Sequence, residues 1–394
     1  MGLLHSHLKR LPLSSAIIYL TFGFLLGPFF LDRLHLTLQH SHLLELLSEV
    51  VVIISVFAAG LKLKVPFRDV RWRLVLRLAS ASMVITVAGV ALLAYFIFDF
   101  SLGAAILLGA ILAPTDPVLA SGVQVQGPED QDRLRFSLTG EAGFNDSTAF
   151  PFVMLGLGLM GLHDLGSFGM KWILKDLIWA IGGGVMIGWG AGWILSHIVT
   201  YYKRHNEESV VLDDFLGFGL VALAYGVAVG LSAYGFIAVF AAAISFQQLE
   251  KKIEQATGDS GDQTVGAVLT FHEQLERIGE VATVLVVGSL LSYVSLREPG
   301  LLLIPLLFLL IRPLSVYSVV QRQQAGGMSR ALMAWFGIRG IGSIYYLTYA
   351  INHGLPATEA ARISSIVLVA IAVSVVVHGV SVTPLMHSYE RARA

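Results

Sequence analysis

Ionisable side chains occur inside long apolar stretches of this sequence, where each costs about 2.5–3.5 kcal/mol to insert into a bilayer. Five of them are Asp116, Glu141, Asp146, Arg312 and Arg339. Such residues usually mark an ion or proton pathway, because partners, water or a bound ion must offset that cost. Carboxylate oxygens are hard ligands that suit alkali cations, and an arginine is a permanent counter-charge. The residue types therefore predict an ion-binding function.

The polar segment 140–148 carries the strongest signal. Glu141 and Asn145 are one helical turn apart and share a face, and Asp146 lies about 100° further round the helix. Ser147 adds a hydroxyl next to Asp146. We predict that Asp146, Asn145, Glu141 and Ser147 contribute to an ion- and proton-binding site. The alternative for Glu141 is a position at the membrane interface.

A second polar group lies where proline interrupts an apolar run, at Pro114-Thr115-Asp116-Pro117. Proline removes a backbone donor and clashes with the preceding helical turn, so the helix should break there. Unwound backbone exposes carbonyl groups that can coordinate a cation. We expect Thr115 and Asp116 to complete the site with Asp146. Alternatively, Asp116 caps the half-helix that follows, since aspartate is a good N-cap.

The two arginines should compensate charge within the bundle. Arg312 lies near the middle of its apolar run and needs a carboxylate or carbonyl partner, for which Glu141 is the natural candidate. Arg339 lies in a glycine-rich break at 337–342, where it could offset helix-end carbonyl groups. An interfacial position is the alternative for Arg339. The two interrupted runs are a matching pair, as the inverted repeats of secondary transporters require.

These groups define a chemistry. Desolvation favours the neutral form of a carboxyl group, so a buried one can take up a proton near neutral pH. The same oxygens hold Na⁺, Li⁺ or K⁺ once the group is ionised, so proton and cation compete. Competition at one site, with access alternating between two sides, gives obligatory exchange. The sequence does not indicate a His/Cys cluster for a transition metal.

The composition indicates which elements position these residues. Hydrophobic residues make up 55% of the 394 positions, charged residues 13%, and the mean hydropathy is +0.74. Soluble domains carry about 25% charged residues, so this chain is an all-α polytopic membrane protein. The chain contains no cysteine, and its net charge of −1 gives no reason to expect nucleic acid. We expect about twelve membrane helices, near 12–31, 43–61, 76–98, 102–123, 135–161, 172–200, 212–230, 233–248, 279–296, 299–320, 331–352 and 363–386.

The distribution of Lys and Arg predicts the orientation. If the N-terminus is cytoplasmic, nineteen of the 26 Lys and Arg residues fall in inside segments and five in outside segments. Both termini should therefore be cytoplasmic. The polar stretch 249–278 is expected to be a cytoplasmic loop. The basic segment 62–77 should face anionic lipid headgroups.

Several motifs resemble those of one transporter family. Ala113-Pro114-Thr115-Asp116-Pro117 resembles the Thr-Asp-Pro break of the monovalent cation/proton antiporters. Residues 141–146 resemble the Glu-Ser-Leu-x-Asn-Asp motif of the NhaP/NHE branch, and 336–340 resemble its Gly-x-Arg-Gly segment. The resemblance covers essentially the whole chain, and several motifs in the right order make it specific.

The resemblance implies an NhaA/NhaP-like antiporter fold with inverted repeats and two interrupted crossing helices. It implies that Asp146 binds cation and proton, that Thr115 and Asp116 complete a monovalent-cation site with it, and that Glu141 pairs with Arg312. Asn145 stands where the electrogenic branch has a second aspartate, which implies electroneutral one-for-one exchange. Ala142 replaces the usual serine, so one hydroxyl ligand is lost and selectivity is open.

The resemblance also implies a domain arrangement. The single transmembrane domain 1–394 should contain core helices around 76–161 and 299–386, and dimerisation or linker helices around 12–61 and 172–248. Relatives are usually homodimers of thirteen-helix chains, whereas twelve helices are counted here, and the difference falls before Leu11. We expect an integral protein of a bacterial inner membrane, in contact with lipid.

The predicted function is exchange of Na⁺ or Li⁺ for H⁺, which serves pH homeostasis. Potassium/proton exchange on the same site is the first alternative, and a gated cation channel is the second. A membrane-embedded aspartyl protease is disfavoured because the sequence has no Gly-x-Gly-Asp pattern. We therefore predict a transporter rather than an enzyme, with no cofactor beyond the transported cation and proton.

Overall fold

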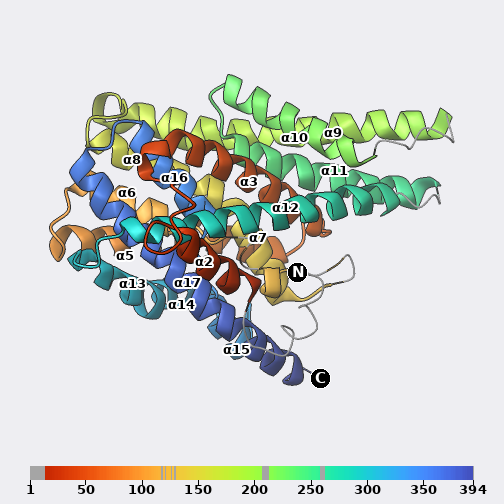
Figure 1. Ribbon diagram of the computed structural model, residues 1–394. Helices are drawn as coiled ribbons and strands as arrows, with labels where there is room; N and C mark the ends of the chain where they lie inside the picture. Colours follow the sequence, from red (N-terminus) through yellow and green to blue (C-terminus); the bar gives the residue numbers. More distant parts are fainter. Residues whose placement is uncertain are drawn as a thin grey trace.

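The computed structural model describes residues 14–116, 119, 121–125, 127, 130–205, 213–257 and 262–393, which form a bundle of helices (Figure 1). Five helices in this part of the chain are long and apolar enough to cross a membrane: Leu38–Lys62, Arg71–Phe96, Ser167–Tyr201, Pro299–Val319 and Ala357–Arg391. Four shorter apolar helices accompany them. The expected all-α membrane fold is confirmed.

Each of the twelve expected runs contains helix in the described residues. Several runs consist of two or three pieces, since π-helical turns and breaks divide them. The elements are α2 (Ser15–Leu26), η1 (Leu38–His40), α3 (Ser41–Lys62), α4 (Arg71–Arg77), η2 (Leu78–Ser82), α5 (Met83–Phe96), α6 (Leu102–Leu112), η3 (Ser121–Val123), α7 (Arg133–Thr148), α8 (Phe150–Leu159), η4 (Ser167–Gly169), η5 (Trp172–Trp179), α9 (Ala180–His205), α10 (Asp213–Gly230), α11 (Gly235–Thr257), α12 (Asp262–Leu290), η6 (Leu291–Tyr293), η7 (Pro299–Leu302), α13 (Leu303–Leu306), η8 (Leu307–Ile311), α14 (Arg312–Val319), α15 (Gly327–Trp335), α16 (Ile341–Asn352) and α17 (Ala357–Arg391).

The expectation of a loop over 249–278 is wrong. Helix α11 continues to Thr257, and α12 begins at Asp262, so helix occupies most of this stretch. The polar residues alternate with apolar ones, and Lys62 of α3 forms ion pairs with Glu273 and Glu276, at 3.3 and 3.6 Å. A polar sequence therefore continues as helix where its charges find partners on a neighbouring helix.

Small residues allow α9 and α11 to pack closely. Gly188 and Gly192 are four residues apart on α9, where a side chain would collide with the backbone oxygens of Ala238 and Ala242. Only glycine permits this approach of two helix backbones. Lipid gives helices little hydrophobic drive to associate, so this pair depends on close contact of small residues.

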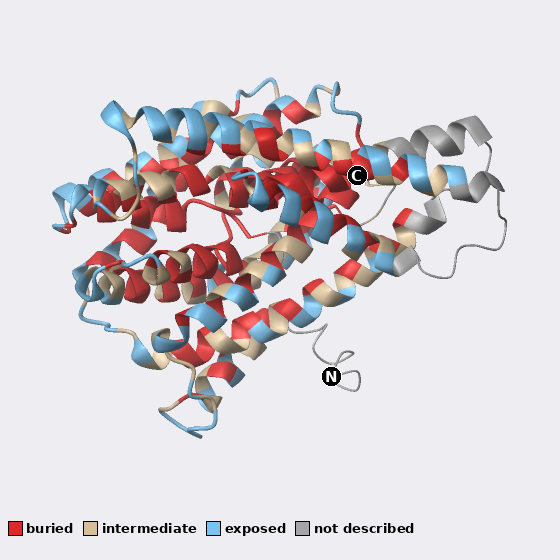
Figure 2. Ribbon diagram, turned by 90° about the horizontal axis from the view of Figure 1, so that it is seen from above, coloured by how far each residue is buried: buried red, intermediate tan, exposed pale blue. Residues whose placement is uncertain are grey.

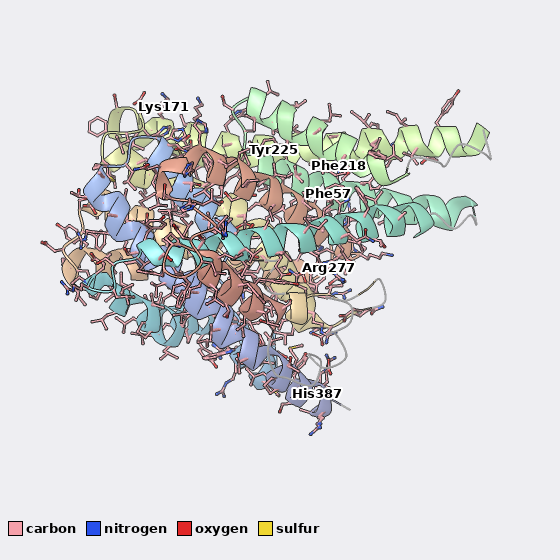
Figure 3. The ribbon with its side chains drawn as sticks, in the orientation of Figure 1. Phe57, Lys171, Phe218, Tyr225, Arg277 and His387 are labelled. Atoms are coloured by element: carbon pink, nitrogen blue, oxygen red, sulfur yellow. The ribbon has the colours of Figure 1, made fainter. Side chains whose placement is uncertain are left out.

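The bundle has two polar ends. At one end, Arg135 of α7 pairs with Glu390 near the end of α17 at 2.6 Å. At the other, Arg362 near the start of α17 donates to the Phe98 carbonyl at 2.7 Å. Figure 3 shows the side chain of Lys171 at this second end and that of His387 near the first. Side chains buried within the protein concentrate between these ends, in the middle of the bundle (Figure 2).

Candidate ion-binding site

Two extended segments meet in the middle of the bundle. One follows α6 at Leu112, where Pro114 ends the helix, and the other is 336–340, between α15 and α16. The Asp116 amide donates to the Ile338 carbonyl at 2.8 Å, so the two breaks are in direct contact. Because both are buried, their backbone groups need partners within the protein.

The Asp116 carboxylate provides part of that hydrogen bonding. One oxygen accepts from the Leu119 amide at 3.0 Å, and the other accepts from the Ile341 amide, which begins α16. Asp116 therefore caps α16, the half-helix across the crossing, as well as the turn that follows it in sequence. The sequence predicted a cap on the half-helix that follows Asp116, where 117, 118 and 120 lie outside the described residues, whereas the helix that Asp116 caps is α16.

Arg339 bridges the two breaks. Its side chain is fully buried, and its guanidinium donates to the Pro114 carbonyl at 3.1 Å. It thereby satisfies a carbonyl group that the proline break leaves without a helical partner. The interfacial position considered from the sequence is wrong, because Arg339 has 0% exposure in the middle of the bundle.

His378 of α17 holds the second break from the other side. Its Nε2 lies 3.0 Å from the Trp335 carbonyl, the last of α15, and its Nδ1 lies 3.1 Å from the Ser374 hydroxyl. The Ser374 hydroxyl in turn accepts from the Arg339 amide at 2.8 Å. The sequence reasoning missed both residues, although their spacing of four within an apolar run was a usable signal.

We expect His378→Leu to lower the thermal unfolding midpoint of the detergent-solubilised protein, because the Trp335 carbonyl keeps only its Gly337 donor and the Ser374 hydroxyl loses the His378 ring nitrogen. Losing a hydrogen bond of this kind costs about 0.5–1.5 kcal/mol. His378→Gln keeps an amide that can donate to this carbonyl, so its midpoint should return most of the way to wild type. Equal midpoints for the Leu and Gln variants would show that the hydrogen bond contributes nothing.

Asp146 lies beside the crossing on α7, 1% exposed. Neither of its carboxylate oxygens has a hydrogen-bond partner among the described residues. The Asn145 amide donates to the Thr115 hydroxyl at 3.0 Å, which ties α7 to the first break. Within the described part of the chain, the Asn145 side-chain oxygen and the Ser147 hydroxyl are also buried and unpartnered. Four buried oxygens on one helix are thus left for a ligand.

Glycine lets α16 approach this carboxylate. A side chain at Gly342 would collide with one Asp146 oxygen, so the start of α16 lies directly against it. The structure therefore brings Asp146, Asn145, Thr115 and Asp116 together around the two breaks, with Ser147 next to them in sequence. A buried carboxylate with no partner is costly unless a proton or a cation neutralises it. These oxygens are the donor set that an alkali cation prefers.

Glu141 and Arg312 form a buried pair one turn before the Asn145 position. Arg312 of α14 donates from both terminal nitrogens to the two Glu141 oxygens, at 2.5 and 2.9 Å, and to the Met333 carbonyl at 3.1 Å. Both side chains are at most 3% exposed. The interfacial alternative for Glu141 is therefore wrong. The pair joins α7, α14 and α15, and no arginine pairs with Asp146 among the residues that the structure describes.

A cavity of about 200 Å³ reaches the crossing from one side. It lies between α2, α12 and α17, and its lining includes Glu280, Leu119, Ile338 and His378. Glu280 was not singled out from the sequence, although it lies within the expected run 279–296. The cavity offers a route by which ions could approach the breaks past a carboxylate.

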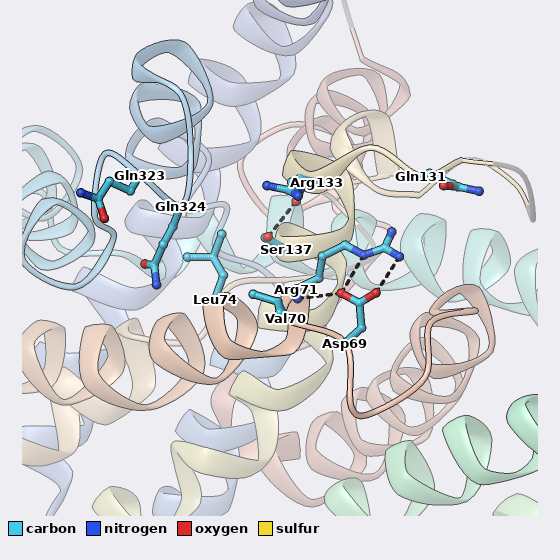
Figure 4. Close-up of a pocket in the computed structure, with 9 residues that line it drawn as sticks. All are labelled: Asp69, Val70, Arg71, Leu74, Gln131, Arg133, Ser137, Gln323 and Gln324. Carbon is cyan, nitrogen blue, oxygen red and sulfur yellow. Dashed lines mark hydrogen bonds and ion pairs between the residues drawn. The ribbon is translucent and has the colours of Figure 1, made fainter.

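A larger cavity of about 420 Å³ lies at the end of the bundle that carries Arg135 and Glu390 (Figure 4). Asp69 faces Arg71 there, accepting from its amide at 2.9 Å and from its guanidinium at 3.1 Å. These hydrogen bonds hold the pKa of the Asp69 carboxyl below its usual value. Figure 4 shows Arg133, Gln131 and Gln324 around the same space. Its residues are separate from the crossing.

Comparisons with known proteins agree on one family. Residues 1–388 match the family described as "sodium/hydrogen exchanger, transmembrane". The chain is 26% identical over 345 residues to the K(+)/H(+) antiporter NhaP2 of Shewanella oneidensis, covering 86% of this chain and 56% of that protein. It is 24% identical over 386 residues to the K(+)/H(+) antiporter NhaP of Alkalimonas amylolytica, covering 96% and 62%. The chain thus spans less than two thirds of these relatives.

A solved structure shares the fold. The sodium proton antiporter MjNhaP1 from Methanocaldococcus jannaschii superposes with a TM-score of 0.75 at 18% identity, covering 98% of this chain and 94% of that one. At this identity the match establishes the architecture alone.

Proposed function

Because this chain belongs to the transmembrane sodium/hydrogen exchanger family, we propose that it exchanges a monovalent cation for protons across a membrane. The observation that carries the proposal is the Asp146 carboxylate, buried beside the crossing with no hydrogen-bond partner among the described residues. It must be neutralised by a proton or a cation, and the two compete for the same oxygens. Alternating access then couples their movements in opposite directions.

The proposed ligands come from helix α7 and from the first break. Asp146 carries the negative charge, and the free oxygens of Asn145 and Ser147 come from the same helix. Thr115 and Asp116 come from the first break, where the hydroxyl and carboxylate also hold Asn145 and α16. We assign the Glu141–Arg312 ion pair and the Arg339 hydrogen bond to the Pro114 carbonyl to maintaining the crossing rather than to binding the ion.

The stoichiometry we propose is electroneutral, one cation for one proton. Asp146 is the one carboxylate of the Asn145-Asp146 pair, and Asn145 cannot take a charge. A second proton would need another group that titrates with the cation. The Asp116 oxygens already accept hydrogen bonds from the Leu119 and Ile341 amides, and we therefore assign the exchanged proton to Asp146.

Sodium and lithium are the proposed cations, and potassium is the second candidate, since the curated relatives above are K(+)/H(+) antiporters. We further propose an inner-membrane homodimer with both termini cytoplasmic. The ion pair of Arg135 with Glu390 places one of the arginines counted as inside at the C-terminal end of α17, which supports this orientation.

Purified protein in liposomes with an imposed proton gradient tests the proposal. We expect added Na⁺, Li⁺ or K⁺ to dissipate the gradient, and the cation with the lowest half-saturating concentration is the preferred one. Clamping the membrane potential should leave the rate unchanged if exchange is electroneutral. Failure of all three cations would refute antiport, and currents beyond carrier turnover would indicate a channel.

A further inference from the structure

A buried tyrosine hydroxyl near the ion site has no explained role. Tyr346 of α16 is 0% exposed, and its hydroxyl has no hydrogen-bond partner in the described part of the chain. The same is true of the Tyr234 hydroxyl, just before α11. Buried hydroxyls are almost always paired with protein, water or an ion, so an unpaired one requires an explanation.

The packing of two helices places Tyr346 close to Asp146. Gly342 of α16 lies against the Asp146 carboxylate, and Tyr346 follows it by one turn. Phe150, at the start of α8, follows Asp146 of α7 by four residues, and its ring centroid lies 5.7 Å from that of Tyr346. The contact between Gly342 and Asp146 and the contact between Tyr346 and Phe150 therefore lie one turn apart along the bundle.

The direction of the side chain brings the hydroxyl back towards the carboxylate. Side chains on an α-helix lean towards its N-terminus. Tyr346 therefore leans towards Gly342, which contacts Asp146.

The two groups are near one another but not in contact. Among the described residues neither the Asp146 oxygens nor the Tyr346 hydroxyl has a partner, so they do not hydrogen-bond to each other. Two polar groups that interact across more than hydrogen-bond distance commonly share a water molecule or an ion between them. The hydroxyl oxygen has lone pairs that can coordinate a cation, and its proton can be donated to water.

From this arrangement we infer that the Tyr346 hydroxyl is a further ligand of the transported monovalent cation, opposite Asp146. The inference rests on the proposed antiport function and adds a ligand to that site. A neutral oxygen adds no charge, so Tyr346 affects the affinity for the cation and leaves the cation-to-proton ratio unchanged. Tyr346 lies on α16, which begins directly after the second break, so the geometry of the site also depends on that break.

The Tyr346→Phe variant removes this oxygen and keeps the ring that packs on Phe150. In the liposome assay we expect the half-saturating cation concentration to rise about three- to tenfold, the loss of one hydrogen-bond-like interaction. The maximal rate should stay within twofold. Thermal stability without cation should be unchanged or higher, since an unpaired buried hydroxyl is itself unfavourable.

Tyr349→Phe is the matched control, because it deletes the hydroxyl one turn further on, which lies 4.0 Å from the Met154 sulfur. It should leave the half-saturating concentration unchanged. An unchanged value for Tyr346→Phe, with the control also unchanged, would overturn the inference. Equal rises in both variants would do the same, since they would indicate a general packing effect.

A binding measurement separates this inference from the proposed function. Cation titration of the thermal unfolding midpoint reports binding without transport. If wild type transports and Tyr346→Phe shows the same cation-dependent stabilisation, the ligand role is wrong while antiport stands. If wild type neither transports nor is stabilised by any of the three cations, the proposed antiport function itself is wrong. Weaker stabilisation of the variant than of wild type and Tyr349→Phe supports the ligand role.

Discussion

Asp146→Asn is expected to abolish cation-dependent dissipation of a proton gradient, down to the rate of empty liposomes. Asparagine has nearly the same size and fits the same buried space, but it cannot carry a negative charge or exchange a proton at neutral pH. The variant should still fold, because the Asp146 oxygens make no hydrogen bond with the described residues that folding would lose. Loss of transport with an intact fold would identify Asp146 as the exchanging carboxylate.

The measurement compares three proteins at equal density in the bilayer. Asp164→Asn is the matched control, since it makes the same chemical change on an exposed loop, where Asp164 pairs with Lys171. It should transport like wild type. Stability is checked by the unfolding midpoint, which for Asp146→Asn should equal or exceed that of wild type, because an unpaired buried charge is removed. Wild-type exchange by Asp146→Asn would reject its assignment.

The fold was largely predictable because a bilayer imposes length and polarity on every spanning segment. All twelve runs contain helix, and the breaks at Pro114 and at 336–340 lie where proline and glycine predicted them. The prediction of a loop was wrong at 249–278, where the sequence becomes polar but α11 and α12 remain helical over most of the stretch. Lys62 lies on α3 and its partners Glu273 and Glu276 on α12, so the pairs that accompany this helix join positions more than 200 residues apart.

The charged residues of the site could be predicted from the sequence, but their hydrogen-bond partners could not. Charge alone pointed to Asp116, Glu141, Asp146, Arg312 and Arg339 inside the membrane. Which groups are already used by the protein is a three-dimensional fact, because Asp116 caps a helix from another part of the chain. The neutral groups were harder to find. Ser374 and His378 offered only their spacing of four, and Tyr346 offered no sequence signal, because one sequence does not show what a side chain faces.

We expect removal of one partner of the Glu141–Arg312 ion pair to destabilise the fold more than any other change at the site. Arg312→Gln leaves a buried carboxylate without its bidentate donor, which costs about 3–5 kcal/mol for a buried pair. The protein should unfold at a markedly lower temperature or fail to accumulate in the membrane. Arg312→Lys should recover only part of the loss, because lysine offers a point charge instead of the planar fork that meets both oxygens.

The double variant Glu141→Gln with Arg312→Gln separates the effect of an unpaired buried charge from the effect of losing the contact between the two side chains. It removes both charges, so no unpaired ion remains, and two amides of suitable length can hydrogen-bond across the same gap. Its unfolding midpoint should lie well above that of Arg312→Gln alone. If the double variant lost as much stability relative to wild type as the Glu141→Gln and Arg312→Gln single variants lose together, the residues would be acting independently, and the 2.5 Å contact would carry no coupling. Transport by the double variant would further show that the pair holds the crossing in place and that Asp146 alone exchanges the ion.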